Sequence, residues 1–187
     1  MVGDRGGCSY LLDSGCVTTV GGFTIYGSPW TPRFWGAFNL DRGEVIAAKW
    51  AAVPAHVDVL VTHGPPLGTR DFVPRVHEHV GCAALAAEVA GRIRPAVHCF
   101  GHIHEGHGTV CHDGIQFVNA SITPWSKLGQ PGLNPPTVFT LRRDGEGNVT
   151  VAMGGNSHRD AAATANPPPL GEPPRGVHGD GGPPGAE

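Results

Sequence analysis

The segment from residue 57 to residue 100 constrains the fold most strongly, because it places one helix between two apolar strands. Residues 57–61 are β-branched and almost wholly apolar, residues 82–93 are rich in alanine, and residues 96–100 are apolar again. A strand that is covered on both faces has this composition. A strand–helix–strand order in turn predicts two parallel strands joined by a right-handed crossover. We therefore expect an α/β fold with a parallel pair of strands at its centre.

Turn signals on both sides of this unit predict antiparallel strands in addition. Gly21-Gly22 and Asp113-Gly114 each separate two short apolar runs, as in a β-hairpin. A helix is expected over residues 44–53, ending before Pro54. Residues 63–80 form a proline-containing loop, of a length that is usually functional or disordered. The predicted hairpins comprise residues 17–26, 108–118 and 137–153, so we expect the sheet system to be mixed.

The composition predicts one folded domain followed by a tail. The chain has 187 residues, including 29 glycines and 18 prolines, and much of this load lies near its C-terminal end. We expect the domain to cover residues 8–154. Residues 155–187 have almost nothing to bury, so we expect a disordered Pro/Gly-rich tail.

Charge and cysteine usage exclude several classes of protein. The net charge is −3 and no long basic run occurs, which argues against a nucleic-acid-binding patch. No apolar run is long enough to cross a membrane, so no membrane association is expected. The five cysteines contain no C-x-x-C pair and no export signal precedes them, which favours reduced thiols and a cytoplasmic location.

Three histidines follow the two strands of the central unit. His63 comes directly after residues 57–61, and His102 and His104 come after residues 96–100. Parallel neighbours end at the same edge of a sheet, so we expect these imidazoles to converge. A single histidine at a strand end is more often structural, but three at one edge, each among glycines or prolines, favour a metal site.

The sequence around these histidines resembles that of a known family. Thr62-His63-Gly64-Pro65-Pro66 and Gly101-His102-Ile103-His104 are similar to the last two motifs of the calcineurin-like metallophosphoesterases. Val118-Asn119-Ala120-Ser121 and Ile25-Tyr26-Gly27-Ser28-Pro29-Trp30 resemble the subfamily of metallophosphoesterase-domain-containing proteins. The resemblance runs from about Tyr10 to Leu141 and implies a mixed-sheet β-sandwich flanked by helices, of the calcineurin-like phosphoesterase type.

The resemblance also implies a function and a set of ligands. Such proteins hydrolyse phosphodiesters or phosphomonoesters at two divalent metals bridged by an aspartate. By the matching positions, His63 and His102 would bind one metal and His104 the other. The metal identity stays open among Mn, Fe, Zn and Mg, and the expected substrate is a small phosphoester or a nucleotide.

The sequence departs from this family in its first half. The family's Asp-x-His, Gly-Asp and Gly-Asn-His motifs should precede His63, and none occurs there in a suitable setting; Gly3-Asp4 is an accidental match. We therefore expect the N-terminal half of the domain to be absent and this chain to have weak or no activity. An uncovered sheet edge could then support self-association.

Two alternatives to an enzyme follow from the same residues. The chain could be a non-catalytic relative that binds a metal, a nucleotide or a protein. A structural zinc protein is a weaker third candidate, because thiolates dominate closed zinc sites and the cysteines of this chain are scattered. The aromatic residues Trp30, Phe34 and Trp35 could line a nucleobase pocket or belong to the core.

Overall fold

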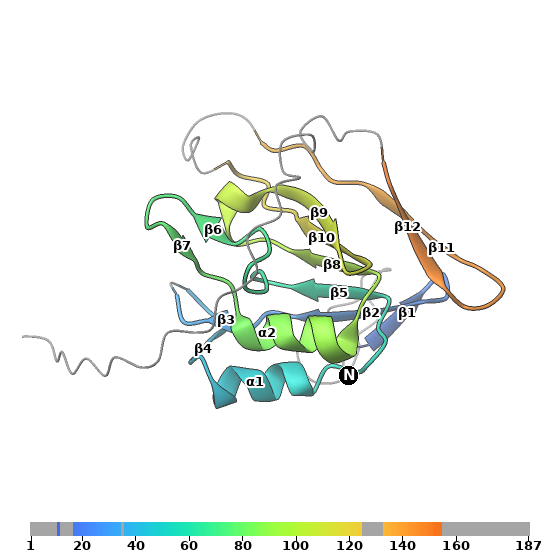
Figure 1. Ribbon diagram of the computed structural model, residues 1–187, viewed down its shortest axis with the longest axis horizontal. Coiled ribbons are helices and arrows are strands. Elements are labelled where there is room, and N and C mark those ends of the chain that lie inside the picture. The colour runs from blue at the N-terminus through green and yellow to red at the C-terminus, as the bar shows by residue number, and fades with distance from the viewer. Residues whose placement is uncertain (1–10, 12–16, 35, 125–132, 155–187) are drawn as a thin grey trace, which may run out of the picture.

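A six-stranded mixed sheet organises the chain in the computed structural model, which describes residues 11, 17–34, 36–124 and 133–154 (Figure 1). The strand order is β1-β2-β5-β8-β10-β9. The four inner strands are parallel to one another, and the two edge strands, β1 and β9, are antiparallel to their neighbours. The strands are β1 (Val17–Val20), β2 (Phe23–Ser28), β5 (Val59–Thr62), β8 (Val97–Phe100), β9 (Gly108–His112) and β10 (Ile115–Asn119).

The helices lie along one face of this sheet (Figure 1). They are α1 (Glu44–Ala51), α2 (Ala83–Glu88) and a π-helical segment, η1 (Val89–Ile93), that continues α2 directly. Apolar side chains of the helices and of this face of the sheet form the core, because burying them removes apolar surface from water. The core includes Tyr26, Ile46, Trp50, Leu60, Leu85, Val89, Ile93, Phe100 and Phe117.

Arg92 joins the two helical segments. Its guanidinium donates to the carbonyl oxygens of Val53 (2.6 Å) and Trp50 (2.9 Å), at the C-terminal end of α1. The last carbonyls of a helix lack partners within the helix, so an outside donor is needed there. Glu88, one turn earlier, accepts from Arg92 Nε at 2.6 Å. These contacts fix α1 against η1.

The connection between β5 and α2 is folded, although the sequence predicted only a long loop. It contains a small hairpin, β6 (Phe72–Val73) and β7 (Glu78–His79), and its two ends meet at Pro66 and Cys82. The carboxylate of Asp71 is fully buried at its centre, where it accepts hydrogen bonds from the backbone N–H groups of Gly68 (2.9 Å) and Gly81 (3.0 Å).

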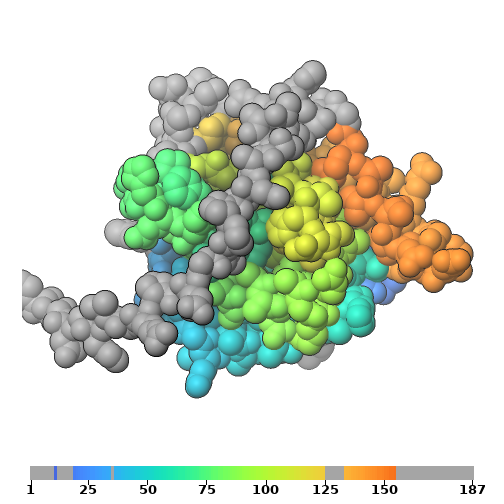
Figure 2. Space-filling model, viewed as in Figure 1, coloured from blue at the N-terminus to red at the C-terminus, as the bar shows by residue number. Residues whose placement is uncertain are grey.

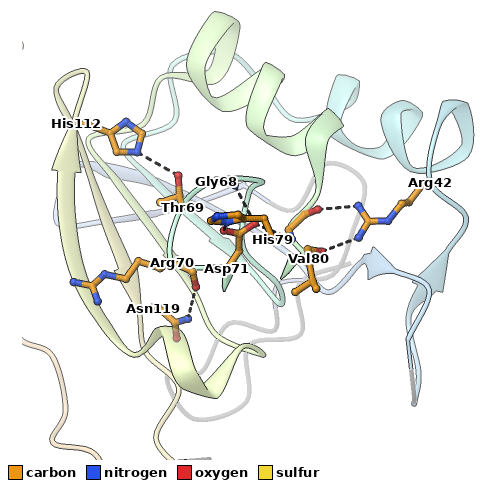
Figure 3. A network of polar contacts seen from close by, with 10 residues as sticks. Arg42, Gly68, Thr69, Arg70, Asp71, His79, Val80, His112 and Asn119 are labelled. Carbon is orange, nitrogen blue, oxygen red and sulfur yellow. Dashed lines mark hydrogen bonds and ion pairs between the residues drawn. The ribbon is translucent and has the colours of Figure 1, made fainter. Parts of the chain in front are cut away.

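Two further side chains brace this connection, His79 from within it and Arg42 from outside it (Figure 3). His79 Nδ1 lies 2.6 Å from Asp71 Oδ1, and Arg42 donates to the carbonyl oxygens of Val80 (2.7 Å) and Gly81 (2.8 Å). A buried carboxylate is costly unless donors surround it, so Asp71 holds the loop in one conformation.

Two smaller elements flank the sheet. β3 (Thr31–Pro32) pairs with β4 (Asn39–Leu40), and β11 (Phe139–Arg143) forms a hairpin with β12 (Val149–Met153). Figure 2 shows the β11–β12 hairpin as a lobe at one side of the molecule. Arg143 ties this lobe to the sheet, because its guanidinium lies 2.7 Å from Asp58 Oδ2 and over the ring of Phe23.

The α/β class and the mixed sheet are therefore confirmed, with strand ends that shift by at most two residues. In the described ranges the one large sheet is accompanied by three two-stranded sheets, and the calcineurin-like sandwich stays a prediction. The expected start of the domain at residue 8 and the expected tail over residues 155–187 lie outside the described residues. No helix in the part described here is long and apolar enough to cross a membrane.

Burial of His98 predicts an acid-sensitive fold. His98 is fully buried in β8, and burial lowers its pKa from 6.5 to about 3. A neutral folded-state imidazole stabilises the protein above the unfolded pKa of 6.5, and this stability is lost as the pH falls towards about 3. We expect His98→Gln, which cannot take up the proton, to remove a slope of up to about 1.4 kcal/mol per pH unit from the free energy of unfolding. Urea unfolding of both proteins between these pH values measures it; parallel pH profiles would contradict the prediction.

Close packing at Gly106 gives a second prediction. A Cβ at this position would lie 2.0 Å from the backbone oxygen of Arg70, whereas a Cβ at Gly91, in η1, would meet nothing within 4 Å. We expect Gly106→Ala to cost more than about 2 kcal/mol by overpacking. The matched change Gly91→Ala should be neutral or stabilise by up to about 1 kcal/mol, because alanine favours a helix. Equal unfolding free energies for the two variants would refute this packing.

Candidate metal centre

The predicted histidines lie where the parallel strands end. β5 and β8 are neighbours in parallel register, with Val61 opposite Cys99, and both chains leave the sheet at its C-terminal edge. The backbone N–H of Gly101 donates to the carbonyl oxygen of His63 at 3.0 Å, which joins the loop after β8 to the loop after β5. His63 and His102 are brought together by this geometry.

The two imidazoles are in direct contact. His63 Nε2 lies 3.0 Å from His102 Nδ1, and the ring centroids are 4.7 Å apart. Two histidine nitrogens that bind one Zn²⁺ at about 2.0–2.1 Å in tetrahedral geometry would be about 3.4 Å apart. The pair therefore fits a shared divalent ion after a small adjustment, and two converging imidazole nitrogens are suitable donors for it.

His104 takes a different position. It begins the 3₁₀ turn η2 (His104–Gly106), and its charge contributes to lowering the pKa of His102, so it lies within electrostatic reach of the pair. Within the described ranges, however, no group of three or more His, Cys, Asp or Glu side chains is arranged to hold a metal ion. The structure thus brings two of the three predicted ligands together, and the ligand role of all three stays a prediction.

Both members of the pair are kept neutral by their surroundings. The pKa of His102 is lowered to about 4, chiefly by burial and in smaller part by the nearby His63 and His104, which disfavour a positive charge. Burial also lowers the pKa of His63. A metal binds the unprotonated nitrogen, so imidazoles that resist protonation are suited to this task at neutral pH.

The loop that carries His102 has an unusual backbone. His102 has φ of +69°, in the left-handed region that residues other than glycine rarely adopt. Such conformations persist where surrounding contacts enforce them, and they gather at functional sites. Asn119 supplies one of these contacts, because its buried amide donates to the carbonyl oxygen of Ile103 at 2.8 Å.

Asn119 and Ser121 are site residues to which the sequence reasoning gave no role. Asn119 Nδ2 also reaches the carbonyl oxygen of Arg70 at 3.2 Å, so it ties the η2 loop to the loop after β5 (Figure 3). Its Oδ1 accepts from the backbone N–H of Ser121 at 3.0 Å. The sequence signal for these two residues was the Val118-Asn119-Ala120-Ser121 motif, which resembled the subfamily but had not been assigned a function.

The aromatic residues near the pair differ in their burial, and the nucleobase pocket stays a prediction. Trp30 packs against the hydrophobic core. Phe34 is 61% exposed and meets His102 edge-on, with ring centroids 5.1 Å apart. Trp35 lies outside the described residues. Phe34 therefore forms one rim of the candidate site.

Comparison with known proteins connects this geometry to a family. No family model matches the sequence. Metallophosphoesterase domain-containing protein 1 of Homo sapiens and that of Mus musculus are each 49% identical to the chain over 135 residues, which cover 72% of this chain and 40% of the relative. A UPF0046 protein of Caenorhabditis elegans is 47% identical over 112 residues, 59% of this chain and 27% of that protein.

The match is therefore partial on the side of the relatives. This chain spans about two fifths of the length of metallophosphoesterase domain-containing protein 1. A solved crystal structure covers 75% of this chain with 17% identity and a TM-score of 0.43, a likeness too low to assign the fold. Over its matched residues, the chain is homologous to the metallophosphoesterase domain-containing proteins.

Proposed function

We propose that this chain carries the histidine side of a metal-dependent phosphoesterase centre, which hydrolyses phosphodiesters or phosphomonoesters in the complete protein. The observation that carries the proposal is the contact of 3.0 Å between His63 Nε2 and His102 Nδ1 at the C-terminal edge of the sheet. The name of two similar proteins, metallophosphoesterase domain-containing protein 1 of Homo sapiens and of Mus musculus, supports the same chemistry.

Each histidine has a defined task in this proposal. His63 and His102 would hold one divalent ion, and His104 would contribute to a second. When bound, the ions would polarise the phosphoryl oxygens and make a nucleophile available at neutral pH. The chain itself supplies neutral imidazoles and loops tied to each other by the hydrogen bond between Gly101 and His63.

The motifs expected to supply the remaining ligands are not found in this sequence. The Asp-x-His and Gly-Asn-His motifs that the resemblance expects do not occur in it. We therefore propose that this chain alone has weak or no activity, and that a metal-binding but non-catalytic role is the alternative. In either case the ion is Mn, Fe, Zn or Mg and the ligand is a small phosphoester or a nucleotide.

Two features support the proposed location and the proposed self-association. In the part of the chain that is described, Cys82, Cys99 and Cys111 are free thiols, as expected in a reducing compartment such as the cytoplasm. The edge strands β1 and β9 are where self-association through an open sheet edge would occur.

Metal binding tests the proposal directly. We expect the full chain to bind Zn²⁺ or Mn²⁺, and His63→Ala and His102→Ala each to weaken binding by more than about 100-fold, beyond the losses typical of outer-shell changes. His77→Asn is the matched control, because His77 is exposed on the β6–β7 turn and asparagine tolerates its positive φ. Competition with a chromogenic chelator measures the affinities.

The result separates the two roles. Unchanged metal affinity in both alanine variants would contradict the site. Hydrolysis of a bis-aryl phosphodiester that depends on Mn²⁺ and on His63 would support an enzyme. Metal binding without hydrolysis would support the non-catalytic role for this chain.

A further inference from the structure

A buried chain of hydrogen bonds lies directly beneath the candidate metal centre. The hydroxyl of Thr62, the last residue of β5, lies 2.7 Å from the carbonyl oxygen of Gly64 and 2.9 Å from Nε2 of His98. His98 comes from the middle of the neighbouring strand β8, 36 residues away. These hydrogen bonds therefore connect the interior of β8 to the turn that carries His63.

The direction of these hydrogen bonds follows from the groups themselves. A carbonyl oxygen only accepts, so the Thr62 hydroxyl donates its single hydrogen to Gly64. The same hydroxyl must then accept from His98, which requires the hydrogen of the imidazole to be on Nε2. Burial lowers the pKa of His98 to about 3, so the ring is neutral at ordinary pH and this tautomer is fixed.

The imidazole has no other hydrogen-bonding role among the described residues. His98 is fully buried and contacts the rings of Phe100 and Phe117, and its Nδ1 has no hydrogen-bond partner in the described part of the chain. A buried nitrogen without a partner costs stability, because it has lost its hydrogen bonds to water. An apolar ring would avoid that cost, so what His98 adds to this position is the donor directed at Thr62.

The final acceptor of these hydrogen bonds lies in the turn around His63. The bond from Thr62 to Gly64 spans His63, and the carbonyl oxygen of His63 is held by Gly101 at 3.0 Å. Gly64 packs closely against Thr31, since a Cβ there would lie 2.9 Å from Thr31 Oγ1. The backbone on both sides of His63 is thus fixed, and its ring faces His102.

We propose that His98 and Thr62 are positioning residues for the pair of His63 and His102. The Nε2–H of His98 orients the Thr62 hydroxyl, which holds the Gly64 carbonyl and so keeps His63 Nε2 beside His102 Nδ1 before any ion is bound. The use of this alignment for metal binding rests on the proposed function; the alignment itself does not. Outer-shell partners of this kind orient metal-binding histidines in proteins.

Four variants of the full chain test the inference. Thr62→Val removes the hydroxyl at constant shape, and Thr62→Ser restores it. His98→Phe removes the donor, and His98→Gln keeps a neutral one. We expect the Zn²⁺ dissociation constant to rise about 10–100-fold in Thr62→Val and His98→Phe, and to stay within about threefold of the wild type in Thr62→Ser and His98→Gln. A valine variant that binds Zn²⁺ as tightly as the wild type would overturn the inference.

Nuclear magnetic resonance of the metal-free chain gives an independent readout. The imidazole of His98 should be the neutral Nε2–H tautomer, and the ring signals of His63 and His102 should shift in Thr62→Val and return in Thr62→Ser. A hydrogen on Nδ1 of His98, or unshifted His63 and His102 signals in Thr62→Val, would overturn the inference.

The two readouts also separate this inference from the proposed function. A wild-type chain that binds neither Zn²⁺ nor Mn²⁺ would overturn the proposed function, and the ring signals would then decide the positioning role alone. The valine and serine variants keep the test decisive if His98→Phe fails to fold, because they change only methyl and hydroxyl groups.

Discussion

The parallel register between β5 and β8 is the constraint on which the rest of the structure depends. With Leu60 opposite His98 and Val61 opposite Cys99, the two strands end at the same edge. A shift of one residue would turn every side chain of a strand to the other face. It would separate Thr62 from His98 and place apolar core residues in solvent. Hydrophobic burial therefore sets the register, and the register sets the site.

Buried polar groups then fix what apolar packing leaves undetermined. Loops expose polar backbone, so apolar contacts alone do not select one loop conformation. Asp71 gathers two backbone N–H groups and His79 in the connection after β5, and Asn119 ties the η2 loop to Arg70. In a water-excluded setting such bonds are directional, and an unmet donor or acceptor is costly. These two side chains therefore give the edge of the sheet a defined shape.

The sequence predicted the sheet well, because apolar strands and glycine turns are local signals. The helix expected over residues 82–93 was found, but its second half is π-helical, and the contacts of Arg92 with α1 that accompany it are not visible locally. The folded connection after β5 was missed because Arg42 reaches it from 39 residues away, and because the sequence alone does not show that Asp71 is buried and accepts from Gly81. The pairing of His63 with His102 followed from topology. The role of Thr62 depends on the register between β5 and β8, which cannot be predicted from the sequence alone.

The separation of the two pair members along the chain has a consequence for folding. His63 and His102 are 39 residues apart, and the segment between them is the whole crossover from β5 to β8. Their contact exists only after that crossover has closed, which is an entropically costly step. An ion held by both nitrogens would act as a reversible cross-link around this loop. Its strength would vary with the concentration of free metal, so the stability of the crossover would respond to the supply of metal in the cell.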